Sequence, residues 1–318
     1  MDVYGGEFAV EHKDDKSPLT EADRRSHETI LSILEAEIPE VPILSEEGAT
    51  IPFRRRREWE RYLLIDPLDG TKEFVKRNGE FTVNIALVER TLPAPDGTDH
   101  PRGNANANSG DRSASRNGAG EGARLRAVWV PVAGVVYAPD LQELFVGSSD
   151  GAWWWGGVAP AQRVGTDGGG TPVAAVPALD AAETIPRDAV RGGRPYTIVA
   201  SRSHMSPETQ AFVDERRAEH PDLDLVSAGS SLKLCRVADG TADEYPRFAP
   251  TMEWDTAAGD AVARAAGCEV SEWSASVGAV GPLEYNKEDL HNPWFLVRRV
   301  DGGVHRAVDS TGRSEERG

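Results

Sequence analysis

The chain has 318 residues, 39% of them hydrophobic, which is enough for one large domain or two modest ones with a real core. Its formal net charge is −17, from 52 acidic and 35 basic residues, and this argues against a non-specific nucleic-acid binder. Neither a signal peptide nor an apolar run long enough for a transmembrane helix is evident. Cys235 and Cys268 belong to no C-x-x-C pair, so we expect reduced, buried thiols and a cytoplasmic location.

The first predicted element is a helix over 21–38, where apolar residues recur at helical spacing. Thr20 followed by Asp23 resembles a capping box with Asp in place of Glu. Five β-rich runs are expected to form strands: 41–47, 60–67, 79–89, 132–139 and 143–155. Residues 91–127 are low in apolar residues and predict a disordered insertion, and 156–192 predict a second, Gly-rich insertion.

From residue 195 onward, strands alternate with helices, which favours an α/β arrangement. The expected elements are a strand and loop in 196–204, a capped helix in 206–220, a strand, Gly-Ser loop and helix in 223–240, a strand in 242–248, and a loop and helix in 253–267. The predicted organisation is an N-terminal α+β metal-binding half over 1–192, a C-terminal α/β half over 193–300 and a tail over 301–318.

The stretch "LLIDPLDGTKEF" at 63–74 places two acids at the end of an apolar strand. Pro67 biases Asp66 toward an extended backbone, so the strand is expected to stop at Asp66. A turn then brings Asp69 back beside it, Gly70 permits close backbone approach, and Thr71 is expected to cap a helix. Convergent carboxylates suit Mg²⁺, and a helix N-terminus suits phosphate. The alternative is a solvated acidic turn with an ordinary threonine cap.

Three other segments also place carboxylates at the rim of an element. Asp23 lies near the start of a helix, Glu46 and Glu47 end a strand, and Asp255 precedes a helix. A single residue of this kind is usually a cap. Four such segments in a chain without a His/Cys metal pattern fit an all-oxygen site for two or three Mg²⁺ ions.

Two motifs carry a family resemblance. "DPLDGTKEF" at 66–74 fits the pattern D-P-[IL]-D-G-T-x-x-F, and "WDTAAG" at 254–259 fits W-D-x-[AG]-[AG]. Together they resemble the lithium-sensitive, magnesium-dependent phosphatase superfamily typified by inositol monophosphatase. Its CysQ-type 3'(2'),5'-bisphosphate nucleotidase branch is the most similar, over roughly 8–90, 128–155 and 195–300. The resemblance implies alternating layers of helices and sheets in two sub-domains, with the metals between them.

The resemblance also implies roles for individual residues. The implied metal ligands are Glu46, Asp66, the Leu68 carbonyl, Asp69 and Asp255. The implied catalytic residues are Asp23, Thr71 and Glu46, with Asp23 and Thr71 orienting the attacking water. The implied substrate-binding residues are Gly70, Thr71, His204, Ser230, Lys233 and Arg247. Lys233 offers a point charge and Arg247 a fork to a phosphate that is not cleaved. The alternatives are solvated surface charges for these two and an ordinary loop residue for His204.

The activity implied by the resemblance is Mg²⁺-dependent removal of the 3'-phosphate from 3'-phosphoadenosine 5'-phosphate, giving AMP, in support of sulfate assimilation. One alternative within the superfamily is a phosphatase acting on inositol phosphates or fructose bisphosphate. A more remote alternative is a non-catalytic metal- or nucleotide-binding protein. The expected partner is a small nucleotide rather than a nucleic acid, and the expected assembly is a monomer or homodimer.

Overall fold

The computed structural model describes residues 1–12, 18–92, 127–159, 178–187, 190, 193–201 and 205–300. Most of the predicted insertion at 91–127, much of the stretch at 156–192 and all of the 301–318 tail lie outside these residues. Within the second stretch, a 3₁₀ turn (Leu179–Ala181) and a short strand, β9 (Glu183–Thr184), belong to the fold. The 156–192 stretch is therefore not wholly an insertion.

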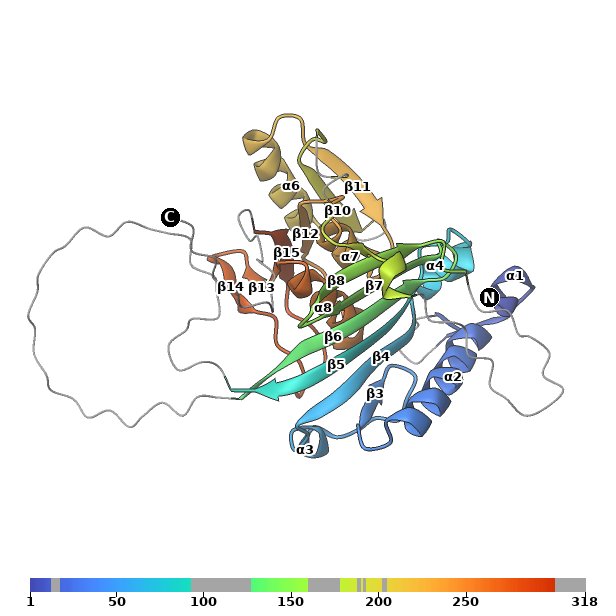
Figure 1. Ribbon diagram of the computed structural model, residues 1–318. Helices are drawn as coiled ribbons and strands as arrows, with labels where there is room; N and C mark the ends of the chain where they lie inside the picture. Colours follow the sequence, from blue (N-terminus) through green and yellow to red (C-terminus); the bar gives the residue numbers. More distant parts are fainter. Residues whose placement is uncertain are drawn as a thin grey trace, which may run out of the picture.

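Five layers alternate between helix and sheet (Figure 1). Helix α2 (Glu21–Glu37) packs on one face of a seven-stranded sheet. Helices α7 (Leu232–Ala238) and α8 (Ala257–Ala265) lie between this sheet and a six-stranded one and contact strands of both. Helix α6 (Pro207–Glu219) packs on the outer face of the second sheet, through its buried Phe212. The predicted layered sandwich is confirmed.

The seven-stranded sheet has its strands in sequence order. It contains β3 (Ile43–Ser45), β4 (Arg61–Asp69), β5 (Thr82–Thr91), β6 (Val128–Ala138), β7 (Glu143–Ser148), β8 (Gly151–Gly156) and β9. β3 pairs parallel with β4, and every later neighbour pairs antiparallel. Side chains along β5 alternate between buried and half-buried, as expected for a strand with one face on the core.

The six-stranded sheet has the order β11-β10-β12-β15-β13-β14. Its strands are β10 (Thr197–Ser201), β11 (Asp224–Ala228), β12 (Glu244–Arg247), β13 (Cys268–Ser274), β14 (Gly278–Pro282) and β15 (Phe295–Arg299). β10 pairs parallel with β11 and β12, whereas the remaining pairs are antiparallel. The α/β prediction therefore holds for the first three strands, and the antiparallel extension by β13, β14 and β15 was missed.

Short elements complete the fold. They are α1 (Asp2–Gly5), the β1 (Val10–His12) and β2 (Pro18–Thr20) ladder, α3 (Phe53–Arg56), α4 (Thr71–Lys76) and a 3₁₀ helix (Glu253–Asp255). The predicted capping box is present at the start of α2, where Thr20 and Asp23 exchange hydrogen bonds. No helix in the described part of the chain is long and apolar enough to cross a bilayer. Both cysteines are buried and free, as predicted.

Two glycines allow α8 to lie directly on the seven-stranded sheet. A Cβ at Gly134 of β6 would lie 2.3 Å from the Ala258 carbonyl oxygen, and one at Gly147 of β7 would lie 2.5 Å from the Val262 Cα. The alanines of α8 are correspondingly small, so helix and sheet approach closely. This contact holds the N-terminal end of α8, and with it the 3₁₀ helix that contains Asp255, beside β4 and β5.

Candidate metal centre and adjoining pocket

The connection from β4 to α4 differs from the predicted turn. β4 continues through Pro67 to Asp69, and its pairing with β5 is irregular between Asp66 and Asp69. A bulge leaves residues outside the ladder, so a proline is tolerated there and the predicted stop at Asp66 is wrong. Thr71 is the first residue of α4, and Gly70 with φ of +89° is the N-cap. The predicted cap by Thr71 is also wrong, and its hydroxyl is used elsewhere.

Three carboxylates from three different elements meet beside this connection. Oxygen atoms of Glu46, Asp66 and Asp255 all lie within 4.8 Å of one another. Glu46 follows β3, Asp66 lies in β4 and Asp255 ends the 3₁₀ helix before α8. Backbone amides fix two of them, because Asp66 Oδ1 accepts from the Leu68 N–H at 3.0 Å and Asp255 Oδ2 accepts from the Met252 N–H at 2.9 Å. The structure thus brings together three of the predicted ligands, with Glu46 rather than Glu47 in the group.

The charges of this group are poorly compensated by the protein. Burial, with the neighbouring carboxylates of Glu46, Asp69 and Asp255, raises the pKa of Asp66 well above its usual range. Burial and Asp69 likewise raise the pKa of Asp255 to about 8. Arg247 offsets part of this increase at Asp255, but no lysine or arginine of the described chain forms an ion pair with Asp66 or Asp255. Closely spaced oxygen donors whose negative charge is only partly compensated fit a hard divalent cation such as Mg²⁺.

Asp69 lies next to the group and is oriented by a network that the sequence did not reveal. Its Oδ2 accepts hydrogen bonds from Ser231 Oγ at 2.8 Å and Asn84 Nδ2 at 3.2 Å. Ser231 Oγ also lies 2.6 Å from the Asp255 carbonyl oxygen and accepts from Asn84 Nδ2 at 2.8 Å. Ser231 therefore links three of the segments that build the site. Its only signal in the sequence is a second serine in the "GSS" before α7.

Replacing Ser231 with Ala is expected to lower the free energy of unfolding by about 1–3 kcal/mol, because buried partners lose a donor and an acceptor. Urea unfolding of the wild type and the variant measures this. Ser276→Ala is a matched control, because Ser276 is exposed, and it is expected to change stability by less than about 0.5 kcal/mol. Equal stability of the two variants would contradict a structural role for the Ser231 hydroxyl.

Asp23 and Thr71 are in direct contact. Thr71 Oγ1 lies 3.2 Å from Asp23 Oδ1 and 3.4 Å from the Leu68 carbonyl oxygen. The other oxygen of Asp23 accepts from both the backbone N–H and the hydroxyl of Thr20, at 2.7 and 2.6 Å. The cap of α2 thus fixes the carboxylate that accepts the hydrogen bond from the Thr71 hydroxyl. The Thr71 oxygen keeps lone pairs that can accept a further hydrogen bond.

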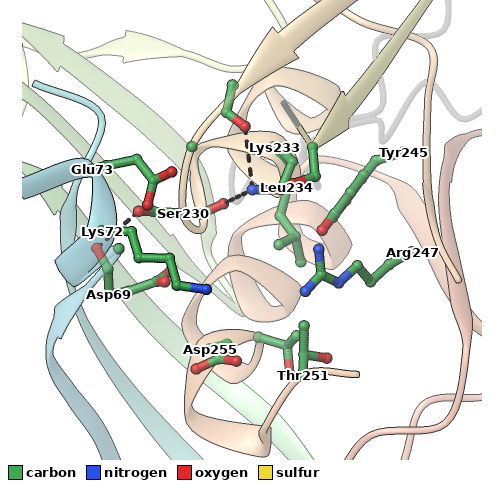
Figure 2. A pocket seen from close by; sticks show the side chains of 15 residues that line it. Asp69, Lys72, Glu73, Ser230, Lys233, Leu234, Tyr245, Arg247, Thr251 and Asp255 are labelled. Atoms are coloured by element: carbon green, nitrogen blue, oxygen red, sulfur yellow. Dashed lines mark hydrogen bonds between the residues drawn. The ribbon is translucent and has the colours of Figure 1, made fainter. Parts of the chain in front are cut away.

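A pocket of about 120 Å³ opens beside these carboxylates (Figure 2). Among its lining residues are Asp69, Gly70, Lys72, Glu73, Ser230, Lys233, Tyr245, Arg247, Thr251 and Asp255. The predicted residues Gly70, Ser230, Lys233 and Arg247 therefore share one cavity with two of the predicted metal ligands. Predicted His204 lies outside the described residues. Lys72, Glu73 and Tyr245 line the pocket but were not singled out from the sequence.

Ser230 and Gly70 meet where the α7 loop contacts the start of α4. Ser230 Oγ lies 2.8 Å from the carbonyl oxygens of both Asp69 and Glu80. A Cβ at Gly70 would lie 2.0 Å from that same Oγ, so only glycine fits there. The Ser230 hydroxyl is directed at these backbone oxygens, and it joins the two segments that form the pocket wall.

The two predicted phosphate-binding cations differ in how they are held. The Lys233 side chain is buried, and its ammonium lies 2.5 Å from the Ser230 carbonyl oxygen and 3.4 Å from that of Ala228. Burial lowers the pKa of Lys233 to about 8. Arg247 Nη2 donates to the Pro250 carbonyl at 2.8 Å. A solvated surface charge is therefore the wrong description of Lys233.

Comparisons with known proteins agree with this geometry. A profile described as "Inositol monophosphatase family" matches residues 1–94 and 129–308. "3'(2'),5'-bisphosphate nucleotidase CysQ" of Salmonella typhimurium is 37% identical over 93% of this chain and 92% of its own. The crystal structure of CysQ from Bacteroides thetaiotaomicron is 42% identical, with a TM-score of 0.65 over 90% of this chain and 86% of that one. Staphylococcal inositol monophosphatase-1, in a LiCl-soaked inhibitory complex, is 15% identical with a TM-score of 0.54 over 92% and 81%, and it shows the fold alone.

Proposed function

Because the chain belongs to the inositol monophosphatase family, we propose that it is a Mg²⁺-dependent phosphomonoesterase that converts 3'-phosphoadenosine 5'-phosphate to AMP and phosphate. The observation that carries the proposal is one pocket that joins an oxygen-donor carboxylate group to the cations Lys233 and Arg247. The name of the Salmonella relative, a 3'(2'),5'-bisphosphate nucleotidase, supports the same substrate.

The carboxylates would hold two to three Mg²⁺ ions, with Glu46, Asp66, Asp69, Asp255 and the Leu68 carbonyl as proposed ligands. Mg²⁺, when bound, supplies Lewis-acid stabilisation of the charge that develops on the phosphate oxygens and the leaving oxygen. The chain itself positions the nucleophile. A water that donates to Thr71 Oγ1 is oriented by the hydrogen bond from that hydroxyl to Asp23.

The cations on the opposite wall distinguish a bisphosphate substrate from a monophosphate. A bisphosphate carries a phosphate that is not cleaved, and we propose that Lys233, Arg247, Ser230 and His204 hold it. The scissile phosphate would lie against Gly70 and Thr71. An inositol monophosphate has no second phosphate to occupy two such cations, so the geometry favours a bisphosphate, and the name of the Salmonella relative favours the nucleotide among bisphosphates.

The test is phosphate release from 3'-phosphoadenosine 5'-phosphate and from inositol 1-phosphate, each with Mg²⁺, with Mg²⁺ plus Li⁺, and with chelator. We expect strong preference for the nucleotide, with activity lost in chelator and inhibited by Li⁺. Preference for the inositol phosphate would contradict the proposed substrate but keep the metal centre. The absence of turnover of both, and of fructose bisphosphate, would favour the non-catalytic alternative.

We propose a cytoplasmic enzyme that clears a by-product of sulfate assimilation, which is compatible with its two free, buried thiols. A monomer or a homodimer remains the prediction for its assembly. We also propose a division of the chain near residue 192, because one sheet uses strands between residues 43 and 184 and the other uses strands between 197 and 299.

A further inference from the structure

We infer that Lys72 is a substrate-binding residue that contacts the uncleaved phosphate and so selects bisphosphates over monophosphates. This inference rests on the proposed function, whose substrate class it explains. Among the residues that the structure describes, the cations that line the pocket are Lys72, Lys233 and Arg247, and the sequence analysis identified the last two. Each of the three is held differently, and that difference is the basis of the inference.

Lys233 and Arg247 are already tied to the protein backbone. The Lys233 ammonium lies 2.5 Å from the Ser230 carbonyl oxygen, and Arg247 donates to the Pro250 carbonyl at 2.8 Å. Some of the donors of each are therefore occupied before any ligand binds. The oxygens of a phosphate with about two negative charges can accept more hydrogen bonds than the unoccupied N–H groups of Lys233 and Arg247 can donate to them.

Of these three described cations, Lys72 is the one whose ammonium donors are all available. It is the second residue of α4, it is exposed, and no hydrogen bond or ion pair within the described residues holds its ammonium. Figure 2 shows its side chain extending from α4 across the pocket, with Nζ on the side where Arg247 and Asp255 lie. Because Lys72 and Arg247 come from opposite walls, an anion between them would be contacted from both sides.

The position of Lys72 next to Thr71 explains why it would act on binding rather than on chemistry. The Thr71 hydroxyl faces Asp23 and the Leu68 carbonyl, whereas the Lys72 side chain lines the pocket that contains Lys233 and Arg247. A point charge on a flexible stem suits a phosphate whose exact position is set by the more rigid groups. Its loss should therefore raise KM for a bisphosphate more than it lowers kcat.

The test compares Lys72→Gln with the wild type on 3'-phosphoadenosine 5'-phosphate and on adenosine 3'-phosphate, which lacks the second phosphate. We expect kcat/KM for the bisphosphate to fall about tenfold to a hundredfold, mainly through KM, and that for the monophosphate to fall less than about twofold. Lys72→Arg should retain most of the preference. Lys76→Gln is the matched control, because Lys76 is exposed on the same helix but does not line the pocket.

Equal losses on both substrates would overturn the inference and place Lys72 at the transferred phosphate or the metals. No loss on either would also overturn it. Binding of the two nucleotides to both proteins is also measured in chelator. If the wild type turns over neither compound, the proposed function is contradicted, but the binding measurement still tests the role of Lys72. Preferential bisphosphate binding that Lys72→Gln abolishes would then support the contact, and equal binding by the two proteins would refute it.

Discussion

Replacing Asp66 with Asn is expected to lower kcat by about a hundredfold to a thousandfold. Asp66 lies at the centre of the carboxylate group, with oxygen atoms of Glu46 and Asp255 within 4.8 Å. An amide keeps the shape and the acceptor for the Leu68 N–H, but it removes the negative charge that a divalent cation requires. Initial rates of phosphate release at several Mg²⁺ concentrations measure the effect.

The same substitution gives an internal control for folding. Burial and three carboxylates disfavour ionisation of Asp66, so a neutral amide should leave the stability of the metal-free protein unchanged or raise it. Asp150→Asn, in the exposed turn between β7 and β8, should leave both rate and stability near wild type. If Asp66→Asn retained Mg²⁺-dependent turnover at a similar rate, the proposed ligand set would be wrong.

The sequence predicted the layered fold class, and it predicted the convergence of three carboxylates because its motifs lie at or near element ends that the layers bring together. Each of the three acids was recognisable beside an apolar run or a helix start: Glu46 follows β3, Asp66 lies within β4, and Asp255 ends the 3₁₀ helix before α8. Strand β15 was missed because its pairing with β12 and β13 is long-range. The β13–β14 hairpin is local, but polar residues interrupt the apolar pattern of β13, and the short β14 contains glycines and a proline.

Local details of the site depended on tertiary contacts that spacing does not report. Pro67 suggested the end of a strand, but pairing with β5 carries β4 past it through a bulge. Threonine is a common N-cap residue, but the Thr71 hydroxyl contacts Asp23, which lies 48 positions earlier in the chain. Ser231 and Lys72 owe their roles to neighbours from other elements, so no periodicity could identify them.

Mg²⁺ should stabilise the protein much more at pH 7.5 than at pH 5. In the absence of metal, the folded protein retains protons on Asp66 and Asp255, since their pKa values are raised, the latter to about 8, whereas the unfolded chain releases them near pH 4. The unfolded state therefore binds fewer protons between these values, and stability in chelator falls as the pH rises through this window. The pKa of Lys233 is lowered to about 8, so above that pH this group makes stability rise with pH instead of fall. The higher of the two measurements is therefore made at pH 7.5, below this range.

A bound divalent cation replaces those protons, so its effect grows as they become harder to retain. Thermal unfolding with and without millimolar Mg²⁺ should show an increase in Tm of several degrees at pH 7.5 and of about one degree or less at pH 5. The difference in Tm with and without Mg²⁺ at each pH cancels the contributions of titratable groups that the metal does not affect. Asp255→Asn should remove much of the pH dependence of this difference, because it removes both a carboxyl group with a raised pKa and a proposed metal ligand. An equal Mg²⁺ effect at both pH values would show that the ion binds somewhere other than these carboxylates.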